Sequence, residues 1–221
     1  MEQITSDLIV LCEGDGDVAF FRKLTRERGI NGFMVTCGKG ADGRCLGESG
    51  FELYLKAVRG GAASGPTIRG IVIVIDSDAD AGAAYGKIKR MLQRVPNMPV
   101  PDKPLQTRKA FGLSLGIILI PGENRKGNLD TLLLDCLAHE NVEQIKQCAE
   151  EFARCAGTDV WSVGDLSKLK LRCILAGITK GNPGMLLPTV LASSECPFDF
   201  QNAALDPIGN YLQDFLRTLG N

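Results

Sequence analysis

Two short apolar runs constrain the fold of this chain more than any other feature. Residues 8–11 and 71–75 consist only of leucine, isoleucine and valine, and glycine and aspartate lie close to both runs. Such runs are too short for typical helices and are typical of strands buried on both faces of a parallel sheet. An acidic cluster follows each run, at residues 13–17 and 76–80. The sequence therefore predicts that carboxylates crowd one edge of a sheet.

The surrounding patterns predict an α/β fold, with a mostly parallel sheet covered by helices on both faces. Four strands are expected, at residues 7–12, 33–37, 71–75 and 114–120. Helices are expected from Asp15 to Gly29 and at residues 51–58 and 81–93. Four prolines between residues 96 and 104 exclude regular structure there.

Helical periodicity replaces this alternation from Asn128 onward, and a last amphipathic helix is expected at residues 207–219. We therefore expect an α/β domain at residues 1–137 and a helical C-terminal extension, residues 138–221, packed on it. A chain of 221 residues that is 44% hydrophobic is sufficient for a packed core.

The overall charge provides no general attraction to a polyanion. The formal net charge is -1, so a nucleic acid would have to be bound by a local basic patch or through a metal ion. No apolar run approaches the roughly 20 residues that a membrane helix requires, so we expect a soluble protein without a membrane partner.

The eight cysteines are expected to be reduced thiols in a cytoplasmic protein, because no signal peptide is recognisable and several cysteines lie within apolar periodic segments. No Cys-x-x-Cys pair occurs. Cys136 and His139 are three residues apart on an expected helix, but two ligands do not make a zinc site.

The acidic clusters predict a site for a hard divalent cation. Asp76 and Asp78 are two residues apart where their strand ends, and Glu13 follows the strand expected beside it. Ligands of open parallel sheets bind beyond the carboxyl ends of the strands. Three carboxylates with several waters suit Mg²⁺ or Mn²⁺. The alternative is that these acids make turns and cap the helices that follow.

These motifs also resemble those of Toprim domains. Residues 8–17, with Phe20 and Phe21 after them, resemble the first Toprim motif, and residues 71–80 resemble the second, an apolar strand ending in Asp-x-Asp. Residues 37–40 are similar to the glycine-lysine turn of Toprim domains in overcoming-lysogenization-defect (OLD) nucleases. The resemblance covers residues 6–137 and implies a Rossmann-like α/β fold.

The resemblance implies Mg²⁺ binding for making or breaking phosphodiesters. It assigns the glutamate role to Glu13 and metal-ligand roles to Asp76 and Asp78, with Asp80 as an additional ligand. The chain looks most similar to small standalone Toprim-like proteins of unassigned function. In these, a glutamate is expected where this chain has Asp130, whose shorter side chain reaches less far toward a metal.

Basic residues are the candidates for binding substrate phosphates. They are Lys39 in the glycine-rich loop, Lys87 and Arg90 on the helix after Asp-x-Asp, and Lys168. Solvated surface charges are the alternative interpretation for each. Trp161 is expected to pack in the core rather than to stack on a base.

The function expected from these features is a Mg²⁺-dependent, nuclease-like phosphodiester hydrolase or phosphotransferase. It would act on DNA or RNA, in a process such as DNA repair or phage defence. One alternative is a non-catalytic regulatory or interaction module that works with a partner ATPase. Another is a nucleotide-binding enzyme that uses the G-x-G-x-x-G pattern at residues 38–43.

Overall fold

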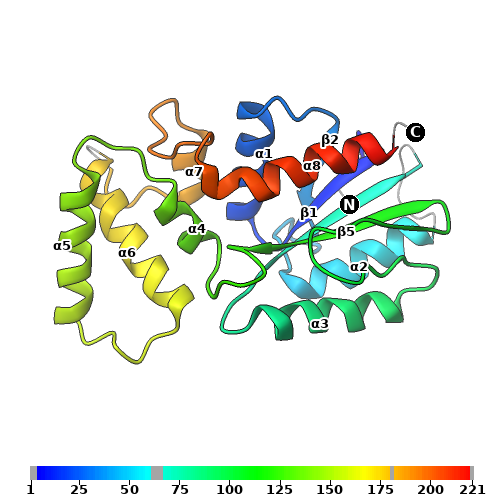
Figure 1. Cartoon of the computed structure of the whole chain (residues 1–221), viewed down its shortest axis with the longest axis horizontal. Coiled ribbons are helices and arrows are strands. Elements are labelled where there is room, and N and C mark those ends of the chain that lie inside the picture. Colours follow the sequence, from blue (N-terminus) through cyan, green and yellow to red (C-terminus); the bar gives the residue numbers. More distant parts are fainter. Residues whose placement is uncertain (1–3, 61–66, 180–181, 220–221) are drawn as a thin grey trace.

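A five-stranded, mostly parallel sheet forms the centre of the computed structural model, which describes residues 4–60, 67–179 and 182–219 (Figure 1). The order of the strands is β2-β1-β3-β5-β4. Their bounds are Leu8–Cys12 (β1), Phe33–Cys37 (β2), Gly70–Asp76 (β3), Arg108–Ala110 (β4) and Leu113–Ile120 (β5). β1 pairs in parallel with both β2 and β3, and β3 pairs in parallel with β5. The predicted α/β fold class is confirmed.

The fifth strand corrects the predicted count of four. β4 is a three-residue edge strand that pairs antiparallel with β5 through a turn at Phe111 and Gly112. Both turn residues have positive φ, as in the two-residue turns that join hairpin strands. β4 consists of two exposed basic residues and an alanine, so it lacks the apolar pattern on which strand prediction depends.

Helices cover both faces of the sheet because successive strand residues point to opposite sides. Val10, Val72 and Ile118 pack with α1 (Asp15–Glu27) and α8 (Asp206–Leu219) on one face. Ile9, Ile73 and Ile117 pack with α2 (Glu48–Arg59) and α3 (Ala81–Arg94) on the other. Figure 1 shows these two helical layers above and below the strands.

The C-terminal helix α8 lies directly on the sheet, and two glycines leave room for it. A Cβ atom on Gly116 would lie 1.7 Å from the hydroxyl oxygen of Tyr211, and one on Gly70 would lie 2.7 Å from the Phe215 ring. The residues on α8 belong to the same apolar cluster as β1, β3 and β5. The core of residues 1–137 is therefore completed by a helix from the C-terminal extension.

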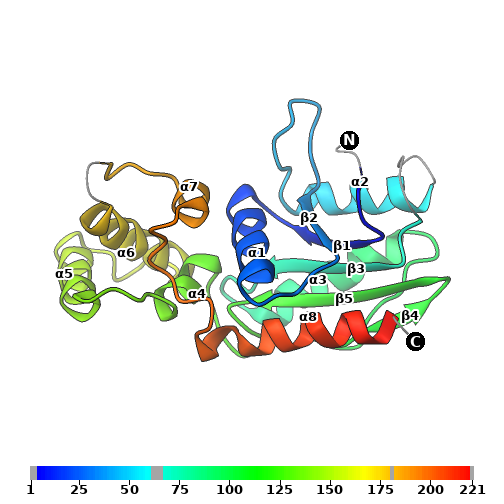
Figure 2. The ribbon, with the colours of Figure 1, turned by 90° about the horizontal axis from the view of Figure 1, so that it is seen from above.

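The remaining helices lie beyond the end of the sheet from which β5 leads into α4, as Figures 1 and 2 both show. They are α4 (Leu129–Asp135), α5 (Val142–Cys155), α6 (Val163–Ile178), α7 (Leu187–Ala192) and a 3₁₀ turn at Ala203–Leu205. None of the helices in the described ranges combines the length and hydropathy needed to cross a bilayer.

Trp161 corrects a second prediction. It lies in the turn between α5 and α6, and 49% of its surface is exposed, so it is not a core residue. Its neighbours Val160 and Val163 are exposed as well, at 92% and 45%. Apolar composition favoured burial, but all three of these side chains remain accessible to solvent in this turn.

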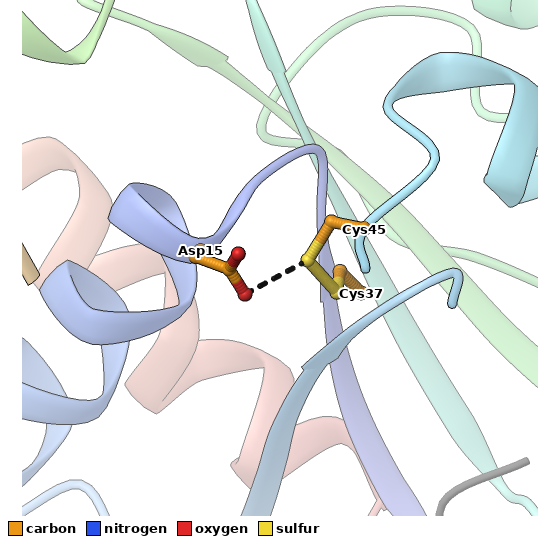
Figure 3. A group of neighbouring side chains, drawn as sticks. All are labelled: Asp15, Cys37 and Cys45. Carbon is orange, nitrogen blue, oxygen red and sulfur yellow. Dashed lines mark hydrogen bonds between the residues drawn. A yellow bond between two sulfur atoms is a disulfide. The ribbon is translucent and has the colours of Figure 1, made fainter. Parts of the chain in front are cut away.

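A disulfide between Cys37 and Cys45 corrects the expectation that all cysteines are reduced (Figure 3). The loop between them folds back, since the Leu46 amide donates to the Gly38 carbonyl and the Gly40 amide donates to the Arg44 carbonyl. This brings the two Cα atoms to 5.6 Å, within the usual range for a disulfide. The free cysteines are Cys12, Cys136, Cys148, Cys155, Cys173 and Cys196.

Candidate active site

Glu13 and Asp76 meet at the ends of two neighbouring parallel strands. Glu13 directly follows β1, and its Oε1 accepts a hydrogen bond of 3.1 Å from the backbone amide of Asp76, the last residue of β3. The Leu129 amide at the start of α4 donates to Oδ1 of Asp76 at 3.2 Å. The strand order also reverses between β1 and β3, as predicted, which is where ligands of open α/β sheets bind.

Asp78 lies just beyond β3 and is held by its backbone. Its amide and carbonyl exchange hydrogen bonds of 2.8 and 2.7 Å with Gly127, and its φ is 48°. Aspartate is among the few residues that adopt this left-handed conformation readily. Its exposed carboxylate raises the pKa of both Glu13 and Asp76, so Asp78 lies near both of these acids.

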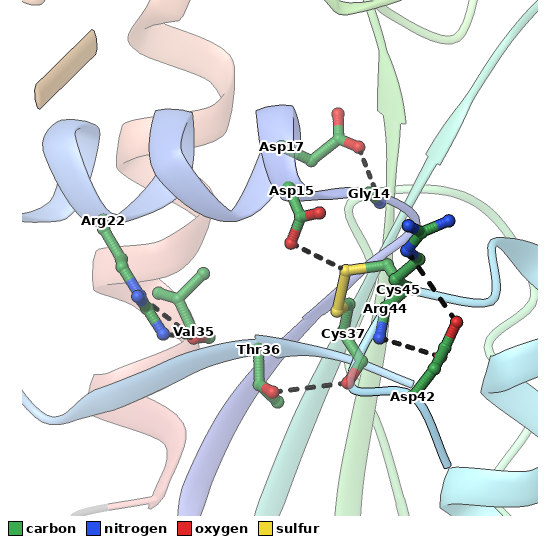
Figure 4. The surroundings of a disulfide bond; sticks show 10 residues. All are labelled: Gly14, Asp15, Asp17, Arg22, Val35, Thr36, Cys37, Asp42, Arg44 and Cys45. Carbon is green, nitrogen blue, oxygen red and sulfur yellow. Dashed lines mark hydrogen bonds and ion pairs between the residues drawn. A yellow bond between two sulfur atoms is a disulfide. The ribbon is translucent and has the colours of Figure 1, made fainter. Parts of the chain in front are cut away.

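Asp17 is a member of this group that sequence reasoning did not select. Its Oδ2 accepts a hydrogen bond of 3.0 Å from the Gly14 amide, within the first turn of α1 (Figure 4). Among neighbouring charges, Asp17 makes the largest contribution to raising the pKa of Asp76. It lies in the first acidic cluster, but a capping role explains an aspartate there equally well, so the sequence alone did not single it out.

Burial and mutual repulsion change the protonation of these carboxyl groups. Burial, followed by the charges of Asp17, Glu13 and Asp78, raises the pKa of Asp76 to about 9. Burial also raises the pKa of Glu13 to about 7 and that of Asp17 to about 6, with smaller contributions from nearby acids. The group therefore retains protons at neutral pH unless a cation compensates its charge.

The donor set fits a hard cation. Carboxylate oxygens suit Mg²⁺ or Mn²⁺, and Mg²⁺ typically keeps several waters beside one or two protein carboxylates. The predicted ligands are neighbours but do not converge: among the described residues, oxygens of Glu13, Asp76 and Asp78 do not all lie within 4.8 Å of one another.

A tighter cluster within the described ranges consists of Asp15, Cys37 and Cys45 (Figure 3). Oδ1 of Asp15 lies 3.2 Å from the Cys45 sulfur. The two sulfurs are bonded to each other, so neither is a thiolate that could ligate a metal, and neither carries a hydrogen to donate.

Asp80 has a structural role. Its Oδ1 accepts a hydrogen bond of 2.9 Å from the Ala83 amide and thereby caps α3. Its carboxylate is exposed, which places it at the helix end rather than among the partly buried acids. Capping, the alternative considered for the acidic clusters, therefore applies to this residue.

Asp130 interacts electrostatically with both the acidic centre and α6. It lies in the first turn of α4, and its charge raises the pKa of Asp17. Burial raises its own pKa, and the charges of Lys168 and Arg172 act against that rise. These three residues line a pocket of about 330 Å³ between α6 and the segment before α7. Sequence reasoning selected Lys168 but not Arg172, although a spacing of four residues places both on one helix face.

The other predicted phosphate-binding residues lie on α3 and on the loop after β2. Lys87 forms an ion pair with Glu48, and Glu13 and Asp78 raise its pKa further, so its charge faces the site from α3. Arg90 and Lys87 both line a hollow of about 660 Å³ between α2 and α3. Lys39 is exposed on the loop that the disulfide closes. That loop forms a turn, and α2 begins only at Glu48, so it differs from the dinucleotide-binding arrangement.

Comparison with known families assigns nearly the whole chain to one of them. The model of the family DUF3226, described as a protein of unknown function, matches residues 7–217. The chain belongs to the DUF3226 family. The match begins just before β1 and ends within α8, so it includes both the sheet of this DUF3226 chain and the helices that follow it. No match was found among curated proteins or among solved structures.

Proposed function

We propose that this DUF3226 protein binds Mg²⁺ or Mn²⁺ through Glu13, Asp76 and Asp78 and hydrolyses or transfers a phosphodiester of DNA or RNA. The observation that carries the proposal is the hydrogen bond from the Asp76 amide to Glu13 across adjacent strand ends, with Asp17 and Asp78 close enough for their charges to act on Asp76. The Toprim resemblance of these motifs supports it. When bound, the cation would polarise a phosphoryl oxygen or lower the pKa of a bound water.

The protein's own groups suit phosphodiester chemistry. Without a cation Glu13 has a pKa of about 7, so at neutral pH little energy is needed to remove its proton and make it a carboxylate ligand. Lys168 and Arg172 on one side and Lys87 on the other place positive charge next to the acids. Such charges stabilise the negative charge of a phosphate and of its transition state.

The direct test is incubation of the purified protein with end-labelled single- and double-stranded DNA and RNA in Mg²⁺, Mn²⁺ or EDTA. We expect cleavage or transfer that EDTA abolishes and that Asp76→Asn and Glu13→Gln lower by at least about 100-fold, the range typical of removed acid–base groups. Glu140→Gln, at an exposed carboxylate distant in sequence, is the matched control. Equal activity of Asp76→Asn and the wild type would exclude the proposal.

A second candidate is a non-catalytic module that acts with a partner ATPase. The observation that favours it is the open arrangement of the three carboxylates, whose oxygens do not converge within 4.8 Å among the described residues. It predicts cation binding by calorimetry without cleavage of any nucleic acid. Co-purification with an ATPase that depends on Asp76 would support it.

A further inference from the structure

The exposed Trp161 borders a hollow that contains positive charge. This hollow, of about 640 Å³, is lined by Trp161, Lys168 and Arg172, together with Ser162, Asp165, Leu169 and Val160. It lies along the first half of α6. An indole face beside two cations is the combination with which proteins bind single-stranded nucleic acids.

Lys168 and Arg172 connect this hollow to the acidic centre. Both also line the pocket of about 330 Å³ that contains Asp130. Their charges act on Asp130, and that of Lys168 acts on Asp17 as well. A continuous surface therefore leads from Trp161 over Lys168 and Arg172 to Asp130. We call it the α6 surface.

The charges on the α6 surface favour a polyanion. Lys168 and Arg172 are exposed, and neither forms an ion pair with a described residue, whereas the nearby Lys170 is paired with Glu150 at 2.6 Å. Two acids adjoin these cations. Asp130 lies at the end of the surface toward the acidic centre, away from Trp161. Asp165, in the hollow, accepts a hydrogen bond from Ser162 in the first turn of α6, where a helix stabilises negative charge.

We propose that the α6 surface binds single-stranded nucleic acid, with one unpaired base stacked on Trp161 and the adjoining phosphates on Lys168 and Arg172. This inference rests on the proposed function, because it names the substrate class and the path by which a strand reaches Glu13 and Asp76. A single strand is favoured because a base in a duplex has no free face for the indole. Local attraction is also required, since the net charge of the chain is -1.

The test uses Trp161 itself, which is the only tryptophan in the chain. Oligothymidylate or oligouridylate is titrated into the full-length protein in EDTA, which keeps cleavage out of the measurement, and tryptophan fluorescence is recorded. We expect saturable quenching and an affinity that decreases as salt increases. A blunt DNA duplex of the same length should quench much less.

Variants are compared by the fluorescence anisotropy of a labelled oligonucleotide. Trp161→Ala should lower the affinity roughly 5- to 150-fold, the range for loss of one stacked base, and Trp161→Phe should restore part of it. Lys168→Glu/Arg172→Glu should lower it at least about tenfold and reduce its salt dependence. The matched controls are Arg108→Glu/Lys109→Glu on the exposed strand β4 and Phe111→Ala, which should change it less than twofold.

Three results would overturn the inference. They are no fluorescence quenching, an affinity of Trp161→Ala equal to that of the wild type, or a loss of affinity in Arg108→Glu/Lys109→Glu equal to that in Lys168→Glu/Arg172→Glu. Equal binding by Trp161→Ala would point to a protein partner for the exposed apolar residues instead. The proposed function and the inference about the α6 surface can be refuted independently. Binding without cleavage in Mg²⁺ contradicts the proposed function alone, whereas cleavage of single strands that Trp161→Ala does not impair contradicts the inference alone.

Discussion

At the scale of single residues, Asp76 is a carboxyl group whose protonation differs strongly between the folded and unfolded chain. Its pKa is about 9 in the folded protein against an ordinary value of 3.8, mainly because it is buried beside other acids. A carboxyl group with a raised folded pKa contributes stability that is complete below the unfolded pKa and is lost as the pH rises through the folded pKa. Without a bound cation, the negative charge of Asp76 is therefore unfavourable in the folded protein.

Removing this charge should stabilise the metal-free protein at alkaline pH. In EDTA, the wild type should lose stability between about pH 4 and pH 9, and Asp76→Asn should flatten that dependence. At pH 8 the variant should be more stable by at least about 2 kcal/mol, because one pKa unit corresponds to about 1.4 kcal/mol. Urea unfolding at several pH values measures this. Asp214→Asn, at an exposed carboxylate, should follow the wild type.

Cation binding should become stronger as the pH rises, whereas the stability of the metal-free protein should decrease. Protons compete with a cation for Glu13 and Asp76, whose pKa values are about 7 and 9, so Mg²⁺ should raise the melting temperature more at pH 8 than at pH 5.5. Thermal unfolding with and without Mg²⁺ provides the comparison. A shift that is the same at both pH values, or that persists in Asp76→Asn, would contradict the site.

At the scale of elements, glycines determine how closely α8 approaches the sheet. Gly116→Ala would place a methyl group against Tyr211 and should destabilise the protein by about 1–3 kcal/mol or more. Gly177→Ala on α6 is the control, because its Cβ would meet nothing within 4 Å. That variant should be neutral or more stable by up to about 1 kcal/mol, since alanine favours helix. Chemical denaturation distinguishes the two outcomes.

The Cys37–Cys45 disulfide holds the loop after β2 in place. The bond joins residues eight positions apart, and loop-closure entropy for this length gives about 2.5 kcal/mol of stability. Cys45→Ser should lose about that much without reductant, and reductant should bring the wild type to a similar level. Cys148→Ser, at an exposed free thiol, should change stability by less than about 0.5 kcal/mol. Wild-type unfolding that reductant does not change would argue against the bond.

At the scale of the whole molecule, the sheet depends on the end of the chain. Tyr211, Leu212 and Phe215 of α8 are buried in the same apolar cluster as Val72 and Ile118. A fragment of residues 1–137 would expose this face of the sheet to water. We expect it to bind a hydrophobic dye and to lack the cooperative thermal transition of the full chain, which calorimetry measures. A cooperatively folded fragment would show that the boundary at residue 137 separates independent units.

Local sequence patterns were sufficient for much of the fold and part of the site. The apolar runs of β1 and β3, the helix that carries Phe20 and Phe21 inward, and the positions of Glu13 and Asp76 at adjacent strand ends were predicted and are present. The strands and the helix depend on hydrophobic periodicity and on turn residues within about ten positions. The proximity of Glu13 to Asp76 was predicted from the connection rules of parallel α/β sheets, which place β1 beside β3.

Only the tertiary structure decided which distant segments meet. Asp130 and Lys168 lie near Asp17, Arg172 lies near Asp130, a disulfide closes the loop after β2, and α8 packs on the sheet. In each case the local pattern of the residues does not identify the distant partner, and it did not predict the exposure of Trp161 either. The physical reason is that periodicity specifies which face of an element is apolar, whereas its contacts depend on how all the elements pack together. By itself, therefore, the sequence determined the layers and the acidic edge of the sheet, and packing decided what surrounds that edge.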